Sequence, residues 1–246
     1  MVRGLCRSAL APLVAAPLIV AASASGPTNS SLAGVPVVQR YLSSPDPDPT
    51  EFRVMRHVDA KSERFGQSAW MDVWTEFDRA AGFRYQIVGE GGSEYIRSKV
   101  FRSSLETERK MWADGSTARA ALTSVNYEFV DAGLQPDGLA SLTLKPRRKG
   151  ELLIDGSIFV HPETGDLVRL EGRLVKSPSF WTRKVEIVRC YKRFAGIRMP
   201  VSLESVAHIL IAGKATFTVS YDYESVNGER FGTPVARLQQ GDVEIK

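Results

Sequence analysis

Apolar and polar residues alternate along most of the chain from Phe52 onward. Phe52, Val54 and Val58 fall on one face of a first expected strand, and the same period of two recurs through residues 71–77 and 83–87. Alternation of this kind is typical of antiparallel strands with one buried face. Similar stretches, separated by turn signals at roughly 10–15-residue spacing, continue to about residue 225. The pattern therefore predicts a meander of sequential strands.

One segment departs from this alternation. Residues 94–114 contain neither Pro nor Gly, and they place apolar side chains such as Ile96 and Val100 at spacings close to the helical period of 3.6. Ser93 is a suitable N-cap, and Gly115 is a suitable residue to end a helix. The sequence therefore predicts one long helix after the third strand.

The order of three strands, one helix and six or seven further strands predicts an α+β fold. A sheet of about 9–11 strands tends to curl, so we expect a strongly curved antiparallel half-barrel packed on the helix. Residues 51–226 are expected to form this domain, and residues 227–246 a polar C-terminal tail. The helix would either fill or cover the concave apolar face.

The N-terminal region is typical of a secretory signal peptide. Arg3 and Arg7 precede an apolar run, and the run ends in the cleavage pattern Ala22-Ser23-Ala24. The run is shorter than the roughly 20 residues that span a bilayer. We expect cleavage after Ala24, a periplasmic or secreted protein, and no remaining transmembrane segment; the alternative is an uncleaved amphipathic anchor. Residues 25–50 are expected to form a flexible arm, with a possible short helix at 35–42, and a Pro-rich linker.

Composition excludes several classes of protein. The chain has 246 residues, of which 43% are hydrophobic and 24% are charged, so it is not disordered as a whole. The net charge of +4 is too small to indicate a nucleic-acid partner. Cleavage of residues 1–24 would remove two arginines and Cys6, leaving Cys190 as the single cysteine. We expect Cys190 to be a buried, inert thiol on a strand, because a reactive cysteine needs an electropositive and exposed niche.

Patterns that carry catalysis are not matched. The chain has no G-x-S-x-G nucleophile motif, and its three histidines, His57, His161 and His208, lie far apart in the sequence. The acidic residues near His161 are typical of a turn at a hairpin tip. The sequence therefore predicts a protein that is not an enzyme and that uses no cofactor and no metal ion.

Residues 152–170 have a recognisable hairpin pattern. The segment contains a strand and then a short turn rich in Gly and Asp. A second strand follows, and it begins with the pattern hydrophobic-x-Arg. With the export signal and the order of elements, this pattern resembles the LolA/LolB-like superfamily of lipoprotein carriers, which includes outer-membrane lipoprotein-sorting proteins. The resemblance covers about residues 50–225 and lies in topology, so no functional residue is carried over. It implies a half-barrel that shelters acyl chains or a lipidated protein, with helices as a lid.

Two sets of residues are candidates for binding. The expected apolar lining, drawn from strands 71–77 and 83–87 and from the helix, consists of Met71, Val73, Phe77, Phe83, Tyr85, Ile87, Ile96 and Val100. The alternative is that these residues form a closed core. Trp70 and Trp74 are expected on the outer face, where they could bind another envelope protein or pack against the arm. We predict a lipid or lipidated protein as ligand; the alternative is an envelope sensor or interaction module without lipid.

Overall fold

The fold is described by a computed structural model over residues 36–237, except 45, 151, 178–181 and 211–212. The predicted signal peptide and the start of the arm lie outside the described residues. Eleven strands form one antiparallel sheet: β1 (Glu51–Ser62), β2 (Gln67–Asp78), β3 (Gly82–Gly92), β4 (Tyr127–Leu134), β5 (Ala140–Pro146), β6 (Ile154–Val160), β7 (Leu167–Leu174), β8 (Thr182–Phe194), β9 (Ile197–Ile209), β10 (Gly213–Val226) and β11 (Glu229–Arg230). The helices are α1 (Val37–Ser43), α2 (Glu94–Ile96), the π-helix η1 (Arg97–Arg102), α3 (Ser103–Ala113) and the 3-10 helix η2 (Ser116–Ala120).

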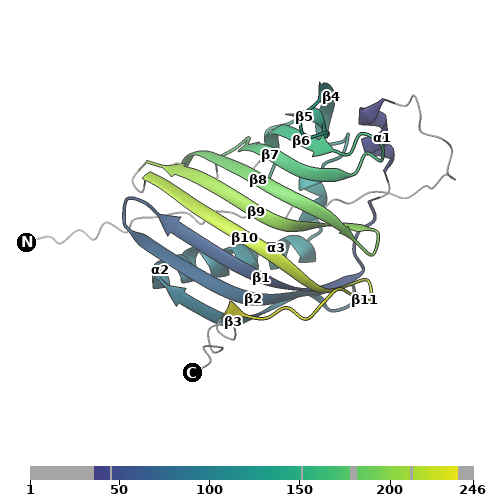
Figure 1. The fold of residues 1–246 in the computed structure, drawn as a ribbon. Helices are drawn as coiled ribbons and strands as arrows, with labels where there is room; N and C mark the ends of the chain where they lie inside the picture. Colours follow the sequence, from purple (N-terminus) through teal and green to yellow (C-terminus); the bar gives the residue numbers. More distant parts are fainter. Residues whose placement is uncertain (1–35, 45, 151, 178–181, 211–212, 238–246) are drawn as a thin grey trace, which may run out of the picture.

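The order of strands in the sheet explains where the long helix lies. The order is β3-β2-β1-β10-β9-β8-β7-β6-β5-β4, so β3 and β4 are the two edges, although they follow each other in the sequence. The chain between them has to cross one face of the sheet, and this crossing contains α2, η1 and α3. Figure 1 shows the curved sheet as one layer with α3 behind it. The predicted curved antiparallel sheet with one long helical segment is confirmed.

The helical segment is not uniform. It consists of α2, one π-helical stretch and α3, and it begins and ends next to glycines with left-handed backbone angles. Gly92 has a φ of +80° and Gly115 has a φ of +65°, which glycine adopts without steric cost. Ser93 makes no side-chain capping bond, and its hydroxyl instead contacts Gln67. Glycine is therefore required at both ends of the helical segment, where the backbone is left-handed.

The main hydrophobic core lies between the concave face of the sheet and the helical segment. It joins Phe101 and Leu105 of the helix to strand residues such as Met71 and Phe217. At the β4 to β7 end, the core is closed by a set of wholly buried aliphatic side chains: Leu142, Leu144, Leu153, Ile154, Ile158 and Leu170. A smaller cluster around Phe52, Phe83 and Tyr223 lies at the other end of the helix, near Trp112.

The two ends of the described chain are both attached to the sheet. The short helix expected at 35–42 is present as α1, and the Tyr41 hydroxyl donates to the Leu122 carbonyl at 2.9 Å. In the linker, buried Asp46 pairs with buried Arg198 at 3.0 Å. After β11 the expected polar tail packs as far as Arg237, whose main-chain amide donates to Asp72. The described arm and tail thus contribute to the fold.

Candidate functional site

Three charged side chains lie inside the core, and each comes from a different element. Arg56 is on β1, Arg189 is on β8 and Glu108 is on α3; their residues are 8%, 2% and 4% exposed. Arg56 has the same strand parity as the inward residues Val54 and Val58, so its side chain faces the helix rather than solvent. The interface between helix and sheet is thus apolar with a charged centre.

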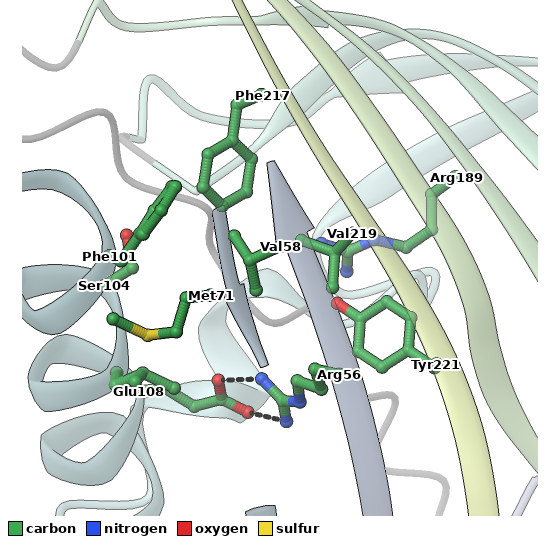
Figure 2. A pocket seen from close by; sticks show the side chains of 11 residues that line it. Arg56, Val58, Met71, Phe101, Ser104, Glu108, Arg189, Phe217, Val219 and Tyr221 are labelled. Carbon is green, nitrogen blue, oxygen red and sulfur yellow. Dashed lines mark hydrogen bonds and ion pairs between the residues drawn. The ribbon is translucent and has the colours of Figure 1, made fainter. Parts of the chain in front are cut away.

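Arg56 and Glu108 form a two-bond ion pair across this interface. Nη1 of Arg56 donates to Oε2 of Glu108 at 2.6 Å, and Nη2 donates to Oε1 at 2.8 Å. Burial lowers the pKa of Arg56, but the charge and hydrogen bonds of Glu108 outweigh it and hold that pKa above its ordinary value. The guanidinium also lies 5.2 Å from the ring centroid of Tyr221, within the range of a cation–π contact. Figure 2 shows this pair beside apolar side chains such as Met71 and Val58.

A small cavity of about 30 Å³ adjoins the ion pair. It is lined by Arg56, Val58, Met71, Phe101, Ser104, Leu105, Glu108, Arg189, Phe217, Val219 and Tyr221. The volume is enough for water-sized molecules, whereas pockets for organic ligands are typically about 300–1,000 Å³. An acyl chain can therefore enter this space only if the helix moves away from the sheet.

Further polar contacts hold the outer side of the helix to β3. Arg97 and Arg102 donate to the same oxygen of Glu90, at 2.7 and 2.8 Å. The hydrogen bond from Arg102 is the largest of the effects that hold the pKa of Glu90 below its usual range. The Tyr85 hydroxyl donates to Glu106 at 2.5 Å, and burial followed by this bond raises the pKa of Tyr85. The helix is thus attached to the sheet by charged contacts on its inner and outer sides.

The eight residues expected to line an apolar site all lie in or beside the core. Met71, Val73, Phe83 and Ile96 are buried, while Phe77, Tyr85, Ile87 and Val100 are half-buried and packed against the two clusters. Met71 also lines the cavity. In this closed arrangement the residues pack as a core, and their role in ligand binding stays a prediction.

Trp70 and Trp74 lie on the convex face, opposite Met71 and Val73, and both are half-buried. The guanidinium of Arg53 lies 4.4 Å from the ring centroid of Trp74, and that of Arg237 lies 5.4 Å from the ring centroid of Trp70. The arm, the alternative neighbour considered from the sequence, contacts β4 at the far edge instead. A partner surface at these tryptophans stays a prediction.

Between the two tryptophans, Asp72 organises a second ion network. Its Oδ1 lies 2.9 Å from Nδ1 of His57, and Nε2 of His57 lies 3.1 Å from Asp222. Burial raises the pKa of Asp72, but hydrogen bonds from the Arg237 amide, His57 and the Arg237 side chain outweigh it, and the pKa is lowered. This network fixes the C-terminal segment on the convex face.

The sequence analysis missed the charged centre of the interface. Arg56, Arg189 and Glu108 were not singled out, although a signal for each was present. Arg56 and Arg189 interrupt the inward, apolar positions of β1 and β8, and Glu108 lies on the helix face that contains Leu105 and Met111. A charge at an inward position is unusual, because burying a charge is costly unless it is paired. The inward position of each charged residue is therefore the sequence signal that could have identified this centre.

Comparison with known proteins gives one kind of likeness. No family model matches the chain, and no curated protein matches its sequence. Among solved structures, the chain is similar to a LolA superfamily protein from Nitrosomonas europaea, with a TM-score of 0.37 and 10% identity over 84% of this chain and 96% of that chain.

Two other solved structures give similar values. One is an outer membrane lipoprotein-sorting protein domain from Vibrio parahaemolyticus, with a TM-score of 0.37 and 10% identity over 77% of this chain and 91% of that chain. The other is a DUF1329 family protein from Desulfovibrio piger, with a TM-score of 0.35 and 10% identity over 79% of this chain and 92% of that chain.

In the part of this chain that the structure describes, no helix is long and apolar enough to cross a membrane.

Proposed function

We propose that this protein is an exported, non-enzymatic carrier that binds the acyl chain of a lipid or lipidated protein between its helix and the concave face of its sheet. The observation that carries the proposal is the buried Arg56–Glu108 pair at the centre of the helix–sheet interface. The predicted signal peptide supports a place in the periplasm or outside the cell. Lipoprotein sorting is the process in which such a carrier would act.

The physical reason concerns the free energy of separating the helix from the sheet. A buried ion pair is weak evidence for stability, because apolar residues of similar volume often hold an interface as well or better. When the interface opens, both charges regain their hydration, so opening costs less than it would for an apolar contact. The pair therefore favours a helix that closes in a defined position and can still be displaced.

The surroundings of the pair suit an apolar chain. Phe101 on the helix faces Val58 and Phe217 on the strands, and Met71 lies beside them. Leu105 also lines the cavity. Displacement of the helix would expose this apolar area, and a bound chain would remove it from water again. Burial of apolar surface contributes about 25 cal/mol per Å².

Native mass spectrometry of the protein, purified without detergent from the organism that produces it, tests the proposal. We expect one bound lipid per protein. We also expect uptake of one molecule when purified empty protein is mixed with palmitic acid, hexadecanol and phosphatidylglycerol. A protein that stays empty in both experiments would contradict the proposal.

A pair of variants on the helix locates the binding. Ser104→Trp places an indole in the cavity and should abolish uptake, while Lys110→Trp adds the same side chain at an exposed position of α3 and should leave uptake unchanged. Thermal unfolding measures whether each variant is folded. Equal uptake by both folded variants would place the ligand elsewhere on the protein.

A further inference from the structure

The positive and negative residues of the cavity belong to different parts of the fold, the sheet and the helix. Arg56 and Arg189 belong to the sheet, on β1 and β8, whereas Glu108 belongs to α3. Figure 2 shows the two arginines and the glutamate around the same space. In the closed protein the lining therefore carries two positive charges and one negative charge. The guanidinium of arginine stays charged at all physiological pH values, so both positive charges persist throughout that range.

Opening of the helix separates these charges. If the helix moves away, as the proposed function requires, Glu108 leaves with it while both guanidiniums remain on the concave face. Arg189 already has interaction partners in the closed protein. Because it also lines the cavity, its positive charge would act on a ligand bound there. A neutral chain that then filled the space would bury Arg56 away from water and without its carboxylate. Burial of an uncompensated charge is strongly unfavourable.

We propose that the ligand carries an anionic head group, a carboxylate or a phosphate, which takes the place of Glu108 on Arg56 and lies beside Arg189. This inference rests on the proposed function and specifies the class of ligand. Glu108 then has the role of an internal substitute: it satisfies Arg56 when the site is empty and yields to the ligand when the site is filled.

The geometry of the closed pair supports this exchange. Arg56 uses both of its Nη atoms to bind both oxygens of one carboxylate, at 2.6 and 2.8 Å. The same planar fork matches a fatty-acid carboxylate or two oxygens of a phosphate. The apolar chain of the ligand would lie on Phe217, Val58 and Met71, which adjoin the arginine in the cavity lining. One amphiphile could thus contact the charged and the apolar parts of the site together.

A comparison of two ligands with the same chain tests the inference on the unmodified protein. Palmitic acid and hexadecanol differ in the head group, and binding of each is measured by isothermal titration calorimetry below its micellar or aggregation limit. We expect the acid to bind about tenfold more tightly or better, because hydrogen bonds to charged groups contribute more than neutral ones. Equal affinities would overturn the inference and leave the proposed function intact. Binding of neither ligand would overturn both.

A further arm identifies the source of the anion. Lysophosphatidic acid carries a phosphate, and it should compete with palmitic acid for one site if both chemistries are accepted. Tighter binding of the lysolipid assigns the site to phospholipid-type ligands, and tighter binding of palmitic acid assigns it to fatty acids. Lack of competition together with equal binding of hexadecanol would contradict an anionic site.

Variants of the arginines locate the preference. Arg189→Met should reduce the ratio of acid to alcohol affinity toward one, since a charge at the head group is lost. Arg53→Met is the matched control on the convex face, where Arg53 pairs with Glu76 and Glu224, and it should keep the ratio of the unmodified protein. An unchanged ratio in folded Arg189→Met protein would show that Arg189 does not contact the head group. The more conservative Arg189→Lys should retain part of the preference.

Discussion

The interface beneath the helix and the β4 to β7 end of the sheet are both buried, but they are built differently. Under the helix, Arg56, Glu108 and Arg189 are buried among apolar residues. From Tyr127 to Leu174, no charged side chain of the described residues is buried, and the wholly buried side chains are aliphatic except for Tyr127. There the Tyr127 hydroxyl accepts from the Ile154 amide at 3.0 Å, and burial raises the pKa of Tyr127 to about 12.

On the proposed function, this difference separates a permanent core from an interface that can reopen. Aliphatic packing gains free energy only while water is excluded, so the β4 to β7 end has no low-cost open state. Charged groups regain hydration when they are exposed, so the interface under the helix loses less on opening. The contrast predicts that the two regions respond differently to mutation and open with different free energies.

Glu108→Leu should give the largest effect. The variant leaves Arg56 buried without its carboxylate, and loss of one partner of a buried pair costs about 3–5 kcal/mol in the free energy of unfolding. The double variant Arg56→Met/Glu108→Leu should be within about 1 kcal/mol of the unmodified protein, because neither charge remains. Urea unfolding measures both variants. A single variant as stable as the double variant would show that Arg56 does not depend on Glu108.

Ile158→Ala tests the permanent core and should lower the free energy of unfolding by about 3 kcal/mol, since it truncates a wholly buried apolar side chain. Urea unfolding measures this loss.

Hydrogen exchange distinguishes the two regions further. Amides of β5 to β7 should exchange only through global unfolding, whereas amides of α3 should exchange through a smaller, local opening. Equal protection of both regions would contradict an interface that reopens.

Local patterns predicted the elements well because the signals are local. Alternation over a few residues identified β1 to β3, and a 3.6-residue period identified the helical segment that Gly115 ends. The π-helical stretch inside it was not predicted, since side-chain spacing does not separate one extra residue per turn from an ordinary helix. The expected polar tail also packs further than its composition indicates, because Arg237 finds partners on β1 and β2.

The charged centre of the site depends on long-range pairing, and that is why the sequence did not reveal it. The expected lining was taken from strands adjacent in the sequence, 71–77 and 83–87. The cavity instead lies where β1 pairs with β10, which brings Val58 opposite Val219. Neither this pairing nor the partnership of Arg56 with Glu108 follows from local pattern. The inward positions of Arg56, Arg189 and Glu108 were visible beforehand, but not that they meet.

Asp72→Asn tests a charged network that holds a segment on the other face of the same strands. We expect a loss of about 1–2 kcal/mol at neutral pH, because hydrogen bonds to a carboxylate are replaced by bonds to a neutral amide. The folded pKa of Asp72 is below its ordinary value, so the stabilisation is present above an unfolded pKa of about 4 and disappears as the pH falls through the folded value. Unfolding at several pH values should show the two proteins converging in acid; a constant difference would rule out this origin.

Arg173→Met should have the smallest effect, and it shows why burial rather than distance distinguishes the two regions. Arg173 and Asp155 approach to 2.8 Å on β7 and β6, close to the distances in the Arg56–Glu108 pair, but their side chains are 59% and 42% exposed. Exposed pairs contribute about 0–1 kcal/mol and are screened by salt. Urea unfolding in low and high salt should therefore show a small difference that vanishes at high salt. A loss comparable to that of Glu108→Leu would mean that charges at the β4 to β7 end also support its core.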